Sequence, residues 1–130
     1  MKLDYFDDSN SDFFNQVFLV VLEIPEGRVT TYGAIAKFLG TVKSSRVVGY
    51  AMNASHKLEK NIPAHRVVNR LGVLTGKNHF NTSTEMEGKL KNEGIKIKND
   101  QIIQFKSHFW DPSELNYLKC ILHDYNTNTL

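Results

Sequence analysis

The longest hydrophobic pattern in the chain predicts a helix near its N-terminus. Apolar residues recur three and four positions apart at Phe14, Val17, Phe18, Val21 and Leu22. This spacing places them on one face of an amphipathic helix. Ser11 can cap its start, and Pro25 followed by Gly27 ends the pattern. We therefore expect a helix from residue 11 to about residue 24.

Two shorter patterns follow and predict two more helices. Thr31 can cap a helix that runs through Leu39, with Ile35 and Leu39 on its inner side. Gly40 then suits the left-handed residue that ends many helices. The next helix is expected from about residue 44 to about residue 54. Two short helices joined by a glycine-containing turn are typical of a helix-turn-helix, although an ordinary helical hairpin shows the same pattern.

The second of these helices has two different faces. Its inward positions are apolar: Val47, Val48, Ala51 and Met52. The opposite face carries Arg46, Gly49, Tyr50 and Asn53. A glycine inside a helix costs about 1 kcal/mol relative to alanine. We expect Gly49 to allow the close approach of another molecule, such as nucleic acid, or else of a packed helix.

The C-terminal half predicts hairpins and two further helices. The stretch RVVNRLGVLT (66–75) indicates a hairpin around residues 69–72, and IKIKNDQIIQF (95–105) one that turns at residues 99–100. Between them, residues 75–83 are polar and predict a loop. Thr84 and Glu87 have capping-box spacing for a helix that ends at Gly94. A last helix is expected to open at Asp111, Pro112 and Glu114 and to carry Leu115, Leu118, Ile121 and Leu122.

These elements predict an α+β domain, small and winged-helix-like, in which a helix-turn-helix precedes hairpins. The 130 residues suit a single core, so we expect an acidic N-terminal extension over 1–10 and one domain over 11–130. A lone cysteine allows no internal disulfide and favours a reducing compartment. No apolar run suits a membrane span or signal peptide. We expect a cytoplasmic, nucleoid-associated protein, or a nuclear one in a eukaryote.

The net charge of +2 hides an uneven distribution. Residues 1–26 hold one Lys and six Asp or Glu, whereas residues 27–70 hold eight Lys or Arg and one Glu. Such a basic block favours a polyanionic partner, because Lys and Arg release counterions when they neutralise phosphates. A solvated basic face is the alternative interpretation.

The stretch IPAHRVV (62–68) looks like part of a site but lacks a reactive residue. His65 and Arg66 stand side by side at the start of an apolar run, typical of functional residues, whereas Ala64 before them offers no nucleophile, ligand, acid or base. The five histidines show no close metal-ligand spacing, so we expect no metal and no cofactor.

Four stretches together resemble the O6-alkylguanine-DNA alkyltransferases. IPEGRVTTYGAIAKFLG, KSSRVVGYAM, IPAHRVVNRLGVL and KLKNEG occur in the order and spacing of that family, and the resemblance covers roughly residues 12–98. It implies the family's DNA-binding domain, which carries a helix-turn-helix and reads duplex DNA from the minor groove. In the family a Pro-Cys-His-Arg cysteine accepts the alkyl group. Ala64 occupies that position, and His65 and Glu93 match the residues that activate the thiol.

A methyl side chain cannot accept an alkyl group, because that transfer needs a strong, soft nucleophile. The resemblance therefore implies the alkyltransferase-like subgroup, which binds O6-alkylguanine in double-stranded DNA, shields it and marks it for nucleotide excision repair. We expect no enzymatic activity, a degenerate site at Ala64, His65 and Glu93, and a monomer whose partners are lesion-containing DNA and nucleotide excision repair proteins.

The resemblance also assigns residues to the interface. Arg46 matches the arginine that enters the duplex where the damaged base has swung out, and Tyr32 the tyrosine that helps to rotate the nucleotide. We expect DNA contacts from Thr31, Tyr32, Lys43, Ser45, Arg46, Gly49, Tyr50 and Asn53. We expect the lesion pocket at Tyr32, Met52, Pro63, Ala64, His65, Arg66, Val67 and Leu74.

Two departures and several alternatives accompany this assignment. Ser55 stands where the family often has asparagine, and the loop at 75–83 lacks the family's glycine-rich pattern with a tyrosine, so that either His79 or Phe80, or neither, closes the pocket. His65 with Glu93 could be a purely structural pair, and Arg66 a structural salt-bridge residue. Two other functions remain possible: alkyl transfer by a displaced nucleophile, Cys120, or regulation by a winged helix that reads undamaged DNA in the major groove.

Overall fold

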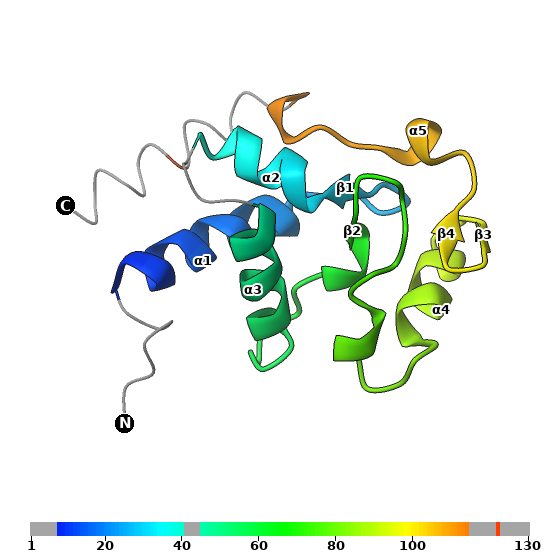
Figure 1. The fold of residues 1–130 in the computed structure, drawn as a ribbon, viewed down its shortest axis with the longest axis horizontal. Helices are drawn as coiled ribbons and strands as arrows, with labels where there is room; N and C mark the ends of the chain where they lie inside the picture. Colours follow the sequence, from blue (N-terminus) through cyan, green and yellow to red (C-terminus); the bar gives the residue numbers. More distant parts are fainter. Residues whose placement is uncertain (1–7, 41–44, 115–121, 123–130) are drawn as a thin grey trace.

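The computed structural model describes residues 8–40, 45–114 and 122, and it shows a mixed α+β arrangement. Helices α1 (Asp8–Leu22), α2 (Tyr32–Phe38) and α3 (Ser45–Ser55) pack together on one side (Figure 1). Helix α4 (Glu85–Asn92) and the hairpin β3 (Ile97–Lys98) and β4 (Gln101–Ile102) lie on the other. The remaining elements are β1 (Thr30–Thr31), β2 (Val67–Val68), α5 (Phe105–His108) and the 3-10 turns η2 (Ala64–Arg66), η3 (Lys77–His79) and η4 (Pro112–Glu114).

A short parallel strand pair joins the two sides. Strand β1 pairs with β2, with Thr30 opposite Val67 and Thr31 opposite Val68. The prediction of a hairpin over 66–75 is therefore wrong about the strand with which residues 67–68 pair, because they pair with β1. The predicted turn is present, because the Asn69 side chain accepts hydrogen bonds from the N–H groups of Leu71 and Val73. Both valines of β2 are buried, which is typical of a strand in a parallel pair covered on both faces.

The apolar side chains form two clusters, one on each side of this strand pair. Helices α1, α2 and α3 enclose the first cluster, which also contains Val67 and Trp110. Helix α4 and the hairpin enclose the second, which contains Val68. Successive side chains of a strand point to opposite faces, so neighbouring valines serve different clusters. The strand pair thus fixes the position of α4 relative to the helical side.

Helix α1 differs from its predicted bounds and its predicted face. It begins at Asp8 rather than Ser11. Leu22, which the pattern placed on the inner face, is 48% exposed, whereas Phe13 and Val20 are buried. The buried face of α1 therefore includes more positions than the predicted pattern, and it is centred on the side of the helix away from Leu22. Within the described part of the chain, no helix combines the length and the apolar character that a membrane span needs.

The helix-turn-helix prediction is confirmed for its two helices. Thr31 Oγ1 accepts a hydrogen bond from the N–H of Ala34 at 3.0 Å, and this cap starts α2. Gly40 has a φ of +60°, the left-handed conformation expected after a helix. The bounds of α3 lie within one residue of the predicted ones, and residues 41–44 between the helices lie outside the described residues.

The predicted turn at 99–100 is confirmed, because Asn99 and Asp100 have φ values of 54° and 62°, as a type I′ turn requires. Helix α4 is confirmed as well, but its capping box is wrong: the Thr84 side chain makes no cap hydrogen bond. Helix α5 was not predicted. The predicted last helix falls largely outside the described residues. Of its predicted apolar residues, Leu122 alone belongs to the described part of the chain.

Candidate nucleic-acid interface and pocket

Helix α3 presents the face that the sequence predicted. Val48, Ala51 and Met52 are buried, whereas Arg46, Tyr50 and Asn53 are exposed on the opposite side. The Arg46 guanidinium carbon lies 5.8 Å from the centre of the Tyr50 ring, within cation–π range. The two side chains thus form a flat, positively charged surface, on which a base or a phosphate could lie.

Gly49 lies in the middle of this face without a neighbour. A Cβ atom built there would meet no other atom within 4 Å among the described residues. The alternative interpretation, a close helix contact at Gly49, is therefore wrong for the described part of the chain. The open surface agrees with the close approach of an external molecule.

The other predicted DNA contacts differ in their exposure. Ser45 is exposed at the start of α3, whereas the Thr31 side chain is buried and caps α2. Tyr32 is half-buried, its hydroxyl hydrogen-bonds with Thr75, and burial raises its pKa. Tyr32 therefore ties the start of α2 to the loop at 75–83. Lys43 lies outside the described residues.

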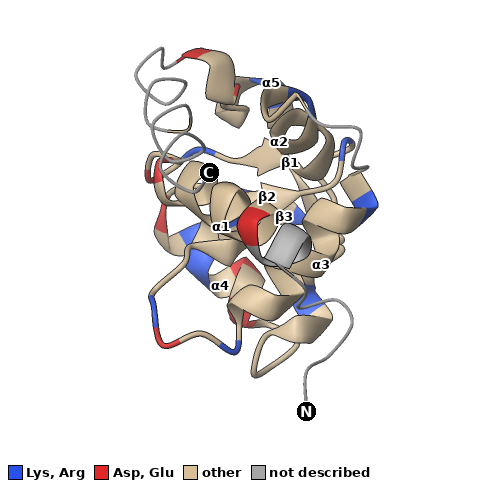
Figure 2. Cartoon of the chain, turned by 90° about the vertical axis from the view of Figure 1, so that its left-hand side faces the viewer, with Lys and Arg blue, Asp and Glu red and all other residues tan. Residues whose placement is uncertain are grey.

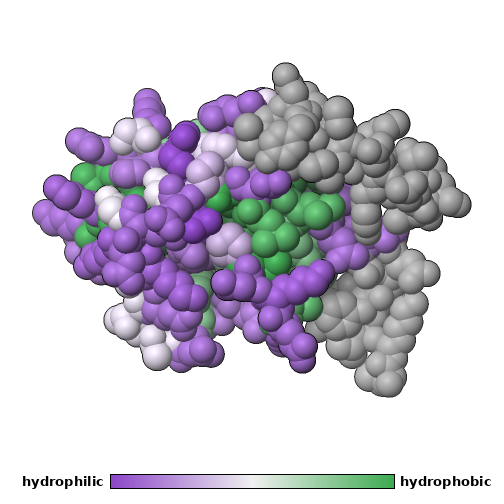
Figure 3. All heavy atoms as spheres, turned by 180° about the vertical axis from the view of Figure 1, so that it is seen from behind, coloured by the Kyte–Doolittle hydropathy of each residue, from purple (hydrophilic) through white to green (hydrophobic). Residues whose placement is uncertain are grey.

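Charged positions are mixed over the side of the molecule shown in Figure 2. Lys and Arg positions in that view are interspersed with Asp and Glu positions. The hydropathy view from behind shows a mostly hydrophilic surface with one hydrophobic patch near its middle (Figure 3). In the view of Figure 2, the Lys and Arg positions therefore do not separate from the acidic positions.

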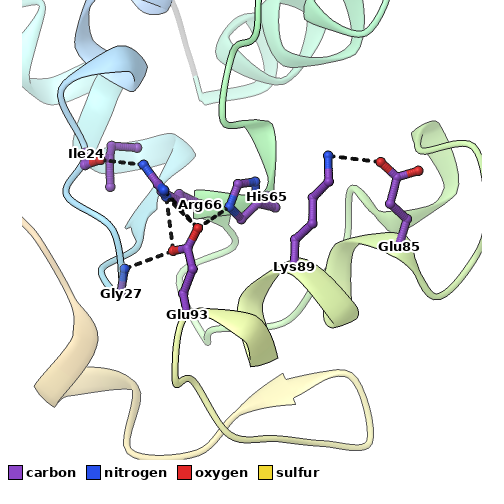
Figure 4. Close-up of polar contacts among 7 residues, drawn as sticks. All are labelled: Ile24, Gly27, His65, Arg66, Glu85, Lys89 and Glu93. Carbon is purple, nitrogen blue, oxygen red and sulfur yellow. Dashed lines mark hydrogen bonds and ion pairs between the residues drawn. The ribbon is translucent and has the colours of Figure 1, made fainter.

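Glu93 is the centre of a buried polar network (Figure 4). Its carboxylate contacts His65 Nε2 at 2.6 Å, and it accepts hydrogen bonds from the Arg66 guanidinium at 2.8 Å and from the Gly27 N–H at 2.8 Å. Arg66 also donates to the carbonyl of Ile24 at 2.9 Å. This one carboxylate therefore links α4, η2 and the turn between α1 and β1. The structural interpretation of Arg66 agrees with these contacts.

The network determines which of its groups are charged. Burial alone would raise the pKa of Glu93, but the hydrogen bonds from Arg66, Gly27 and His65 outweigh it and lower the pKa to about 2. The pKa of His65 is lowered by burial and by the charges of Arg66 and Lys89, against the opposing effect of Glu93. At neutral pH, Glu93 is thus ionised and His65 neutral, which is the pairing a general base needs.

Ala64 lines a cavity of about 180 Å³ next to this network. Among the described residues the cavity is lined by Ser55, His56, Leu58, Lys60, Asn61, Ile62, Ala64, His79, Phe80, Asn81, Glu85 and Lys89. Of the residues predicted for the lesion pocket, Ala64 is the one that lines it. Met52, Val67 and Leu74 are buried in the two clusters, His65 and Arg66 belong to the network, Pro63 is half-buried, and Tyr32 reaches the loop at 75–83.

The mouth of the cavity carries a cluster that the sequence analysis largely missed. The His56 and Phe80 rings lie 4.5 Å apart edge to face, and His79 stacks on His56 at 6.5 Å. Lys89 Nζ lies 5.8 Å from the centre of the Phe80 ring and 3.0 Å from Glu85. Burial, and then His79, lower the pKa of His56. His79 and Phe80 were named as candidate closing residues, but no local spacing relates them to His56 or Lys89.

The arrangement can hold a planar, partly polar group beside Ala64. It offers aromatic faces, two lysines and the amides of Asn61 and Asn81. In the described part of the chain, no three His, Cys, Asp or Glu side chains are grouped so that they could hold a metal ion.

Comparison with known proteins gives consistent matches. A family model described as "6-O-methylguanine DNA methyltransferase, DNA binding domain" matches residues 12–95. The chain is 32% identical over 105 residues to alkyltransferase-like protein 1 of Schizosaccharomyces pombe, covering 78% of this chain and 96% of that protein. It is 34% identical over 100 residues to a DNA base-flipping protein of Vibrio parahaemolyticus, covering 77% and 97%.

A solved structure matches as well. The crystal structure of S. pombe Atl1 in complex with damaged DNA containing O6-carboxymethylguanine superposes with a TM-score of 0.68 at 30% identity, over 85% of this chain and 98% of that chain.

Proposed function

The chain belongs to the family of the 6-O-methylguanine DNA methyltransferase DNA-binding domain, and on this premise we propose that it is a non-enzymatic sensor of O6-alkylguanine in duplex DNA. The family and the alkyltransferase-like resemblance expected from the sequence are confirmed by the matches. The helix-turn-helix fold is confirmed by the structural match.

One observation carries the proposal: the cavity is present and the reactive group is not. Ala64 lines the cavity, and the next residue, His65, contacts Glu93 at 2.6 Å, the kind of pair that activates a neighbouring nucleophile. A methyl side chain supplies no nucleophile. A chain with this combination binds the damaged base without accepting its alkyl group.

Binding in this way requires the base to leave the duplex. The O6 edge of a stacked base cannot enter a protein cavity, and extrusion costs a few kcal/mol. Arg46 is long and planar, and it lies at an exposed position of α3 above Tyr50. It fills the vacated space by stacking and hydrogen bonding, while the open surface at Gly49 brings the helix close to the minor groove.

The small side chain at position 64 also bears on which adducts are accepted. The methyl side chain of Ala64 occupies little space where it lines the cavity. We expect O6-methylguanine and O6-benzylguanine to bind with similar affinity. A steep loss of affinity with adduct size would contradict this part of the proposal.

After binding, the protein shields the lesion and passes it to nucleotide excision repair. The protein acts as a monomer. Its compartment is that of the DNA, which is the nucleoid in a prokaryote and the nucleus in a eukaryote. These parts of the proposal extend the resemblance of the sequence to the alkyltransferase-like proteins, and the similarity to the S. pombe alkyltransferase-like protein supports that resemblance.

The first experiment is fluorescence anisotropy with matched duplexes that carry O6-methylguanine or guanine. We expect at least a tenfold preference for the lesion, which corresponds to about 1.4 kcal/mol. Mass spectrometry of the protein after incubation should show no added methyl group. Equal affinity for both duplexes would instead favour a regulator of undamaged DNA, and a mass increase abolished by Cys120→Ala would favour a displaced nucleophile.

Arg46→Ala tests the role of α3 in the same assay. We expect a loss of lesion binding of about 1–3 kcal/mol and a smaller preference for the lesion over guanine. Lys37→Ala, at an exposed position in the last turn of α2, removes the same charge and serves as the control. An equal loss on damaged and undamaged DNA would reduce Arg46 to a phosphate contact.

A further inference from the structure

Helix α4 carries two ion pairs of the same type, but one of them lines the cavity. Glu85 and Lys89 lie 3.0 Å apart, and Glu87 and Lys91 lie 2.6 Å apart, both four residues apart along the helix. Glu85 and Lys89 belong to the lining of the Ala64 cavity, whereas Glu87 and Lys91 do not. The second pair therefore provides a matched reference for the first.

Lys89 is held in a defined place at the cavity. Figure 4 shows its side chain rising from α4 between His65 and Glu85, and its ammonium lies 5.8 Å from the centre of the Phe80 ring. The Lys89 side chain nevertheless remains 48% exposed. The Lys89 side chain thus lines the same cavity as Ala64 and is still accessible to a ligand.

The rest of the lining favours a negative or acceptor-rich ligand end. Lys60 is a second cation, and Asn61 and Asn81 add amide donors. Glu85 is the one acidic residue among the described residues of the lining. It already binds Lys89, and it also accepts a hydrogen bond from the N–H of Asn81 at 3.2 Å. A ligand carboxylate can replace Glu85 on Lys89 while Glu85 keeps the Asn81 contact.

We propose that Lys89 is a specificity-determining residue, which recognises O6-alkyl groups that end in a carboxylate. This inference rests on the proposed function, because the adduct must first enter the Ala64 cavity. The Lys89 ammonium donates a charge-assisted hydrogen bond to the adduct carboxylate, and such bonds are about twice as strong as neutral ones. Glu85 competes with the adduct for Lys89 and limits the preference.

The test compares two adducts of nearly equal shape in one duplex: O6-carboxymethylguanine and its uncharged amide, O6-carbamoylmethylguanine. The wild-type protein is expected to bind the carboxylate about tenfold more tightly than the amide, a difference of about 1.4 kcal/mol. Lys89→Gln should bind both equally. Glu85→Gln frees Lys89 and should raise the preference above the wild-type value.

Lys91→Gln and Glu87→Gln are the matched controls, since they change the same charges on the same helix outside the cavity. They should leave the preference unchanged. Equal binding of both adducts by the wild-type protein, or an equal effect of Lys91→Gln and Lys89→Gln, would overturn the inference. Failure of the proposed function looks different, because neither adduct would then be preferred over guanine. Unchanged melting temperatures establish that the variants are folded.

Discussion

Two glutamates at opposite ends of α4 each hold a cation, and their surroundings differ sharply. Glu93 binds Arg66, and the two side chains are 10% and 16% exposed. Glu85 binds Lys89, and those side chains are 26% and 48% exposed. Glu93 also contacts His65 and the backbone of Gly27, whereas Glu85 faces an open cavity. The same kind of ion pair therefore stabilises the fold at one end of α4 and lines the cavity at the other.

This difference gives a structural reason why the His65–Glu93 pair stands beside an alanine at position 64. Glu93 joins three segments that are distant in sequence, so its loss would disturb the fold whether or not position 64 reacts. His65 retains its partner for the same reason. The residues at the mouth of the cavity, such as Glu85 and Lys89, link no distant segments in this way.

Of the substitutions considered for α4, Glu93→Gln should lower the free energy of unfolding the most. It removes the charge partner of a buried Arg66, and breaking one side of a buried ion pair costs about 3–5 kcal/mol. Urea denaturation should show this loss in the free energy of unfolding. An effect under 1 kcal/mol would mean that solvent compensates Arg66.

Acidification acts on the same network. The pKa of Glu93 is about 2, below its ordinary value of 4.5, and that of His65 lies below 6.5. The unfolded chain therefore binds protons that the folded chain resists. Stability should fall as the pH drops below about 6.5 through the His65 contribution, and fall further between 4.5 and 2 through Glu93. Thermal melts of the wild-type protein and His65→Gln check this, since the variant should lose less stability in the upper range.

Gly27→Ala should have an intermediate effect. Gly27 has a φ of +81°, its N–H donates to Glu93 at 2.8 Å, and a Cβ there would lie 3.4 Å from the Glu93 carbonyl oxygen. Left-handed backbone at a non-glycine residue costs about 1–3 kcal/mol. Gly33→Ala, at an open helical position, is the control and should not destabilise the protein. Equal melting temperatures for the two variants would contradict the expectation.

Glu85→Gln should have the smallest effect on stability. Exposed ion pairs contribute little to stability, so we expect no measurable change in the free energy of unfolding by urea denaturation. Together with Glu93→Gln, this measurement separates the two ends of α4. A loss equal to that of Glu93→Gln would show that the cavity mouth also belongs to the folding core.

Local chemistry made much of this fold predictable. The Thr31 cap, the Gly40 turn and the 99–100 turn each depend on residues close in sequence, and each is confirmed. The parallel pairing of β1 with β2 was not predictable in this way, because it joins residues 37 positions apart. Leu22 shows the same limit: a helical period gives a face, but the neighbouring segments decide how wide the buried arc is.

For the site, too, local motifs were predictable and contacts between distant segments were not. The position of Ala64 and the pairing of His65 with Glu93 followed from motifs, and the structure brings these residues together. The lining of the cavity did not follow, because His56, Phe80 and Lys89 come from three separate segments. Predicted walls such as Leu74 lie instead in the apolar clusters.

Residues 108–110 close the fold from the far end of the described chain. The N–H of Val29 donates to the carbonyl of His108, and the N–H of Trp110 donates to the carbonyl of Val29. Contacts within α2 and α3 are local and can form early, whereas pairing over eighty residues is slow. During synthesis, the contacts of α2 with α3 can therefore form before the pairing around Val29 is complete. That pairing forms only after Trp110 has left the ribosome, and it then fixes β1, from whose end α2 begins.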